Sequence, residues 1–169
     1  MASGNCDGTQ MNYAILFALF GTCIAYEPLS QSKVLEFADT QLHSGPLKRS
    51  NDFLYVDVDD AWIHAVAPLI KEEGFTKPPY FGNDLVGAHI SVAFPAEINN
   101  GQEIIECGTK IDFIPRGCAI VRLNKPSTHL PNVTEVYVLI VDAPTLDQIR
   151  EQYQLPKLPY PFHITLGVK

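Results

Sequence analysis

The amino-acid sequence predicts an α+β fold of two similar lobes, a bilobal and pseudo-symmetric arrangement in which antiparallel sheets face a central cleft and helices lie outside. Two observations support this prediction. A strand, an acidic residue and a helix follow one another twice along the chain, first around residues 53–74 and again around residues 136–152. After each helix comes a proline-containing connector and then an apolar strand in which a histidine stands two residues before a hydroxyl. Such a repeat predicts lobes built from residues 53–94 and 135–169.

The elements of the first lobe follow from local periodicity. Apolar residues recur at helical spacing over 32–42, which predicts a short helix ahead of the lobe. Residues 53–59 are rich in β-branched and aromatic side chains and predict a strand. The helical spacing of apolar residues over 60–74 predicts the helix that follows.

The second lobe repeats this order. A strand over 136–141 leads through Asp142 to a helix over 145–152, and Pro144 marks the start of that helix. Between the lobes, glycine and proline residues separate three short predicted strands. These strands cover residues 103–107, 110–114 and 118–123.

The candidate catalytic residues lie in two predicted strands, residues 88–94 and 162–168, each of which contains one histidine. Residues i and i+2 of a strand project from the same face, roughly 6.6 Å apart. His89 therefore shares a face with Ser91, and His163 shares a face with Thr165, while the reverse sides are apolar. Two imidazoles can act as base and acid near neutral pH, and two hydroxyls can donate hydrogen bonds to an anionic oxygen. These side chains suit attack on a phosphodiester without a metal ion.

The paired motifs resemble those of the 2H phosphoesterase superfamily, which includes 2′-5′ RNA ligase-like proteins and RNA 2′,3′-cyclic phosphodiesterases. The resemblance extends from about Phe53 to the C-terminus. It implies that His89 and His163 are the catalytic acid and base and that Ser91 and Thr165 bind the phosphate. It also implies hydrolysis of a 2′,3′-cyclic phosphate, or a related phosphodiester, of an RNA end or small nucleotide. Which histidine is the base stays open.

Further candidates for substrate binding lie outside the motifs. Tyr80 and Tyr160, in the connectors before the motif strands, could stack a base, although packing roles are equally open. Lys110 and Arg122, between the lobes, could line the cleft or carry ordinary solvated charge. If the second motif strand runs regularly to its end, Lys169 lies on the same face as His163 and Thr165 and could contact substrate. No cofactor and no metal are expected, because neither motif offers a third ligand at the spacing of zinc sites.

Composition fits one compact domain and excludes some partners. The chain has 169 residues, of which 46% are hydrophobic and 18% charged, enough to bury a sizeable core as a monomer. Its net charge of −7 argues against a large nucleic-acid footprint and favours a small nucleotide or RNA-end substrate. Two alternatives remain at this point: a non-catalytic module that binds nucleotide or RNA, and a secreted interaction domain of the same fold.

The N-terminal stretch over residues 13–25 is mostly apolar but too short for a stable membrane span. Residues 1–25 are either a signal peptide or an N-terminal apolar helix, ahead of a single domain over residues 26–169. The protein is secreted in the first case and cytoplasmic in the second. Cleavage would leave Cys107 and Cys118 as a pair that could form a disulfide, and Asn132 begins a glycosylation sequon.

Overall fold

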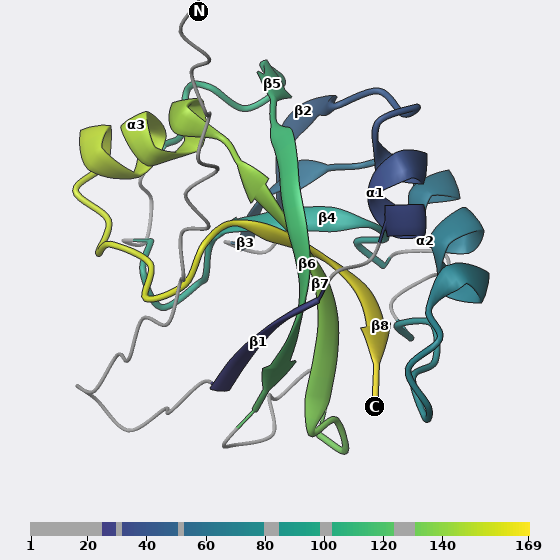
Figure 1. The fold of residues 1–169 in the computed structure, drawn as a ribbon. Coiled ribbons are helices and arrows are strands. Elements are labelled where there is room, and N and C mark those ends of the chain that lie inside the picture. The colour runs from purple at the N-terminus through teal and green to yellow at the C-terminus, as the bar shows by residue number, and fades with distance from the viewer. Residues whose placement is uncertain (1–24, 30–31, 51–52, 80–84, 99–102, 124–130) are drawn as a thin grey trace, which may run out of the picture.

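The computed structural model describes residues 25–29, 32–50, 53–79, 85–98, 103–123 and 131–169. Within these ranges the chain folds into strands and a few short helices, which confirms the α+β class (Figure 1). The elements are β1 Ala25–Leu29, α1 Ser32–Ala38, β2 Ser44–Ser50, β3 Phe53–Asp57, α2 Ala61–Val66, the 3₁₀ turn η1 Ala67–Leu69, β4 His89–Ala93, β5 Lys110–Asp112, β6 Ile114–Arg122, β7 Glu135–Asp142, α3 Pro144–Gln152 and β8 His163–Val168.

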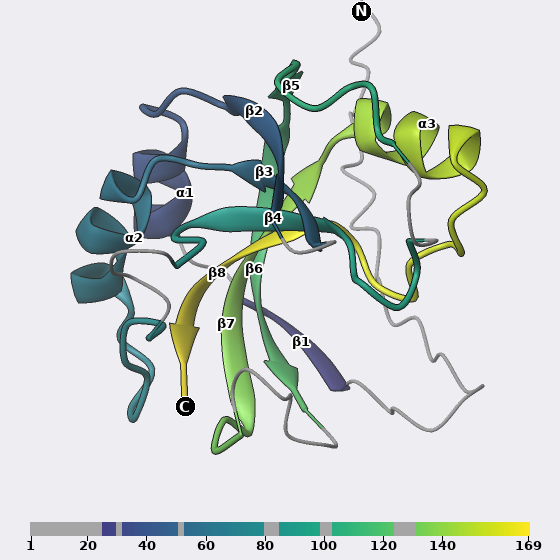
Figure 2. The ribbon, with the colours of Figure 1, turned by 180° about the vertical axis from the view of Figure 1, so that it is seen from behind.

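The strands form one sheet of eight in the order β1-β6-β7-β8-β4-β3-β2-β5, and every neighbouring pair is antiparallel. Antiparallel pairing agrees with the prediction, but the strands do not separate into two facing sheets. β4 and β8 are direct neighbours, so the strands expected in different lobes continue one sheet. Figure 2 shows β4, in teal, running beside β8, in yellow.

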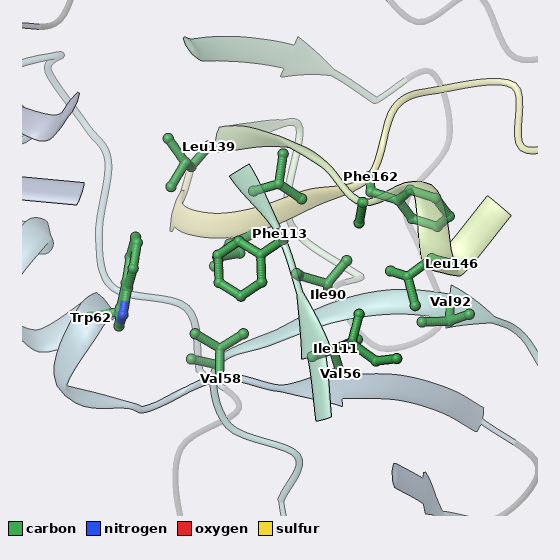
Figure 3. Packing of buried hydrophobic residues seen from close by; sticks show 14 of the residues in the cluster. Val56, Val58, Trp62, Ile90, Val92, Ile111, Phe113, Leu139, Leu146 and Phe162 are labelled. Atoms are coloured by element: carbon green, nitrogen blue, oxygen red, sulfur yellow. The ribbon is translucent and has the colours of Figure 1, made fainter. Parts of the chain in front are cut away.

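One apolar core joins the sheet to all three described helices. Figure 3 shows Trp62 of α2, Leu146 of α3 and Ile90 of β4 in the same cluster. Each of these side chains is at most 2% exposed. Burial of a large apolar side chain contributes roughly 1.5–3 kcal/mol, so this cluster is the main force that fixes the helices against the sheet.

Prolines and local turn bonds shorten two predicted elements. The helix expected over residues 60–74 ends at Val66 and continues only as the 3₁₀ turn η1. Pro68 lacks an N–H and its ring crowds the carbonyl four residues earlier, which ends an α-helix. The strand expected over residues 103–107 is instead a turn, in which the Cys107 N–H donates to the Ile104 carbonyl at 3.3 Å.

Two strands, β1 and β2, were not predicted. The β2 sequence includes Gly45 and Pro46, which are poor strand formers. Gly45 is required there because a Cβ at this position would lie 1.9 Å from the Asp57 carbonyl oxygen of β3. Because glycine has no side chain, β2 can approach β3 closely. Local strand propensities do not predict this need for glycine, since it depends on the neighbouring strand.

The disulfide that was possible between Cys107 and Cys118 is not formed in the structure. Cys107 is exposed, Cys118 is buried, and both are free thiols. Cys118 lies on β6, whose neighbours in the sheet are β1 and β7, whereas Cys107 lies in a turn before β5. The two cysteines therefore do not lie on neighbouring strands, which would have favoured a bond between them.

Most of the N-terminal apolar stretch, residues 13–24, lies outside the described residues. None of the described helices is long and apolar enough to cross a membrane.

Candidate active site

The two motif strands meet at the centre of the sheet. In the antiparallel ladder between β4 and β8, Ile90 pairs with Ile164. Both isoleucines are fully buried in the core shared with the helices. Because neighbouring residues of a strand point to opposite faces, the polar residues that flank each isoleucine project from the face away from this core.

This register groups four polar side chains. One step either side of the isoleucine pair, antiparallel pairing sets His89 opposite Thr165 and Ser91 opposite His163. All four side chains are partly exposed. Directly opposite residues have Cβ atoms about 4.5–5.5 Å apart, so each histidine lies beside the hydroxyl of the other motif. The sequence predicted these four residues, and the structure brings them together on one face.

Both imidazoles are held in the same way. His89 Nδ1 donates to the Gly87 carbonyl at 2.7 Å, and His163 Nδ1 donates to the Pro161 carbonyl at 3.0 Å. A carbonyl oxygen only accepts hydrogen bonds, so Nδ1 carries the proton in each neutral ring. Nε2 is then the atom of each ring that can take a proton from, or give one to, a bound molecule.

The peptide before each histidine is also held in the same way. The Val58 N–H donates to the Ala88 carbonyl at 2.9 Å, and the Val141 N–H donates to the Phe162 carbonyl at 2.9 Å. The two valines occupy equivalent positions in the repeat, each just before the acidic residue that precedes a helix. The repeated sequence thus makes the same hydrogen bond to each motif strand.

Electrostatics oppose two protons on the pair of imidazoles. Burial lowers the pKa of His89, against the Gly87 carbonyl and the Asp57 carboxylate, which both raise it. Burial also lowers the pKa of His163; the Pro161 carbonyl raises that pKa, and charge on His89 lowers it further. A proton on one ring therefore opposes a proton on the other, which suits a pair that works as one acid and one base.

Aromatic rings flank both histidines. The ring of Phe53 lies 5.5 Å from the His89 ring, and the ring of Tyr55 lies 6.0 Å from it, both edge-on. Asp57 is the partner of His89 in the β3–β4 ladder. On the other side of the site, the Tyr160 ring lies 5.6 Å from the His163 ring.

Of the other residues predicted to bind substrate, some lie beside the two histidines and others lie far from them. Tyr160 lies beside the site, while Tyr80 lies outside the described residues. Lys110 is on β5 at the sheet edge, separated from β4 by β3 and β2. Arg122 ends β6 and pairs with Glu135 at 3.1 Å, at the opposite end of β7 from the partner of His163. The structure therefore does not bring Lys110 or Arg122 to the histidines.

Lys169 also lies away from the site, because β8 contains a bulge. Val138 pairs with Thr165 but Tyr137 pairs with Gly167, so Leu166 has no partner in the β7 ladder. The extra residue reverses the alternation beyond it. Lys169 Nζ instead pairs with Glu135 at 3.1 Å, so the parity inferred from the sequence is wrong at this position.

Sequence reasoning missed three residues around His89. Phe53, Tyr55 and Asp57 alternate along β3, and this alternation shows that they share a face. The sequence alone does not show that β3 pairs with β4 and so sets that face beside His89. Among the residues that the structure describes, no group of three or more histidine, cysteine, aspartate or glutamate side chains is placed to hold a metal ion.

Comparison with known families confirms the resemblance to 2H phosphoesterases. A family model described as Swiss Army Knife, 2H phosphoesterase domain, matches residues 54–169, which is more than half of the chain. No curated protein and no solved structure gives a significant match. The matched range begins in β3 and contains both histidine motifs.

Proposed function

The chain belongs to the Swiss Army Knife family of 2H phosphoesterase domains, and we propose that it is a hydrolase that opens a 2′,3′-cyclic phosphate, or cleaves a related phosphodiester, of an RNA end or small nucleotide. One observation carries the proposal. His89 and His163 project from one face of adjacent strands, and each ring has its Nδ1 atom tied to a backbone carbonyl. With Nδ1 bonded to a carbonyl, Nε2 is the atom of each ring that exchanges a proton with substrate in the proposed reaction.

The mechanism uses the two rings in opposite protonation states. The neutral imidazole takes a proton from water through Nε2 as the water attacks phosphorus. The protonated imidazole gives its Nε2 proton to the departing ribose oxygen as the phosphorus–oxygen bond breaks. Each positioned acid or base contributes about 10²–10⁴-fold in rate. One proton enters the pair from water and one leaves with the alcohol, so the pair holds a single proton throughout. After the reaction that proton is on the ring that acted as base, and exchange with solvent returns it to the ring that acts as acid.

Ser91 and Thr165 supply the electrostatic part of the mechanism. Each hydroxyl lies opposite a histidine of the other motif and donates to a non-bridging phosphoryl oxygen in the proposal. Donors aimed at developing charge stabilise the transition state by a few kcal/mol when they are preorganised. The strand ladder provides that preorganisation, because both residues lie within β4 and β8.

A two-lobed arrangement around a cleft remains part of the proposal. The matched hydrogen bonds from Val58 to Ala88 and from Val141 to Phe162 support equivalent halves. The rings of Phe53 and Tyr55 on one side, and of Tyr160 on the other, support walls around the phosphate. A net charge of −7 favours a small substrate over a long nucleic acid, and the mechanism needs neither cofactor nor metal.

Turnover by the full-length protein tests the proposal. The substrates are 2′,3′-cyclic mononucleotides, 2′-5′ and 3′-5′ linked dinucleotides and an RNA oligonucleotide that ends in a cyclic phosphate, all assayed in EDTA. We expect turnover of at least one substrate, and a loss of roughly 10²–10⁴-fold in His89→Ala and in His163→Ala. The double variant should be little worse than either single, because the rings act as one unit.

His64→Ala is the matched control, because His64 is exposed on α2 and lies in neither motif. It should retain wild-type turnover. Binding of nucleotide without turnover would support the non-catalytic module instead. Wild-type turnover in both single histidine variants, or activity that EDTA abolishes and zinc restores, would overturn the mechanism.

A further inference from the structure

The carboxylate of Asp60 holds the Gly87–Ala88 peptide, which lies one residue before the peptide that Val58 holds. Asp60 is the N-cap residue of α2, yet its side chain makes no capping hydrogen bond. The neighbouring Asp59 bonds the start of the helix instead, since its Oδ1 accepts from the Ala61 N–H at 2.8 Å. Asp60 Oδ1 accepts from the Ala88 N–H at 2.7 Å, across 28 residues of chain.

This bond determines where the Gly87 carbonyl points. The described part of the chain contains no cis peptide, so the unit that joins Gly87 to Ala88 is trans. In a planar trans peptide the C=O and the N–H point in opposite directions. Turning the Ala88 N–H toward Asp60 therefore turns the Gly87 oxygen away from Asp60, and that oxygen accepts from His89 Nδ1 at 2.7 Å.

Gly87 is the residue that permits this arrangement. Its φ of +71° lies in the left-handed region, where side chains are rarely tolerated. A Cβ at this position would lie 2.4 Å from Asp60 Oδ1. The carboxylate thus packs directly against the glycine, and Ala88 is held from its other side by the hydrogen bond from Val58.

We propose that Asp60 is a positioning residue for His89, which acts through the Gly87–Ala88 peptide to keep the proton of the neutral imidazole on Nδ1 and Nε2 available for catalysis. The catalytic consequence rests on the proposed function, whereas the effect on the imidazole does not. The second motif provides an internal comparison. The carbonyl that accepts from His163 Nδ1 belongs to Pro161, whose ring restricts its own φ, and Asp60 makes no bond there.

The first test is the tautomer of each histidine in the full-length protein. Imidazole ¹⁵N chemical shifts at pH 8 distinguish Nδ1–H from Nε2–H rings. The wild type should show Nδ1–H at both His89 and His163. In Asp60→Ala, His89 should shift toward a mixture with Nε2–H while His163 stays unchanged. Asp60→Asn keeps an oxygen acceptor and should resemble the wild type.

Asp59→Ala is the matched control, because it removes a neighbouring carboxylate that bonds the helix and not the peptide. It should leave both histidine tautomers and kcat unchanged. If Asp60→Ala does not fold, Asp60→Ser replaces it, since serine can cap the helix but its side chain is shorter by one atom and should not hold the Ala88 N–H.

Kinetics provide the second test. We expect Asp60→Ala to lower kcat by about 10- to 100-fold, the range found when a group that orients a metal-bound histidine is removed, with little change in KM. A folded Asp60→Ala or Asp60→Ser protein with the wild-type His89 tautomer would overturn the inference. So would an equal effect of Asp59→Ala. A tautomer change in a protein that turns over no phosphodiester would keep the positioning role and reject the proposed function.

Discussion

Replacing Arg150 by alanine should lower the free energy of unfolding by about 3–5 kcal/mol. Arg150 lies on α3 with only 4% of its surface exposed. Its Nη2 atom pairs with Glu97 Oε1 at 2.6 Å and also donates to the Pro156 carbonyl, while Nη1 donates to the Val92 carbonyl of β4. Truncation removes the cation that pairs with Glu97, whose side chain is only 18% exposed. A largely buried charge without a partner is the source of the large cost.

Burial, and not ion-pair distance, sets this magnitude. Arg116 pairs with Asp142 at 2.7 Å, almost the same separation, but these side chains are 55% and 52% exposed. Arg116→Ala should therefore cost about 0–1 kcal/mol, because solvent screens an exposed pair. Arg150→Met combined with Glu97→Met should cost less than Arg150→Ala alone, because both charges are then removed together.

Urea unfolding followed by fluorescence of the single tryptophan, Trp62, measures all of these changes, since Trp62 is 2% exposed in the core. The m-value should stay constant across the set, so that midpoint shifts report stability. A loss in Arg150→Ala below about 1 kcal/mol, or equal to that of Arg116→Ala, would refute the reasoning that burial controls the cost.

Burial lowers the pKa of both motif histidines in the folded protein, below the value of about 6.5 in the unfolded chain, so the unfolded chain binds more protons as pH falls below 6.5. Thermal stability should therefore decline from pH 7.5 to pH 5, and less steeply in the double histidine-to-alanine variant; parallel curves would contradict this. Ser91→Ala and Thr165→Ala should each lower turnover less than loss of a histidine and also weaken binding of a phosphate ester, as initial-rate kinetics can show. Alkylation followed by peptide mass spectrometry should find exposed Cys107 modified quickly and Cys118 slowly, because burial raises the pKa of the Cys118 thiol to about 11. Recovery of a peptide with the two cysteines linked would show that a disulfide forms.

The sequence by itself determined the local features of this protein. The motif strands, the shared face of each histidine and its hydroxyl, and helix α3 after Pro144 all follow from short-range periodicity and from the limited φ range of proline. The repeat of strand, acidic residue and helix could also be recognised in the sequence. For the same reason, the four residues of the candidate site could be named without coordinates.

Only the tertiary structure decided which strands pair and in what register. Pairing of β4 with β8 merged the expected sheets into one, and pairing of β3 with β4 brought Asp57 to His89. A one-residue bulge at Leu166 moved Lys169 away from the site. Hydrogen bonds between distant segments, such as that from Ala88 to Asp60, depend on the whole chain being folded. Periodicity specifies which face a side chain occupies, but long-range packing specifies what lies opposite that face.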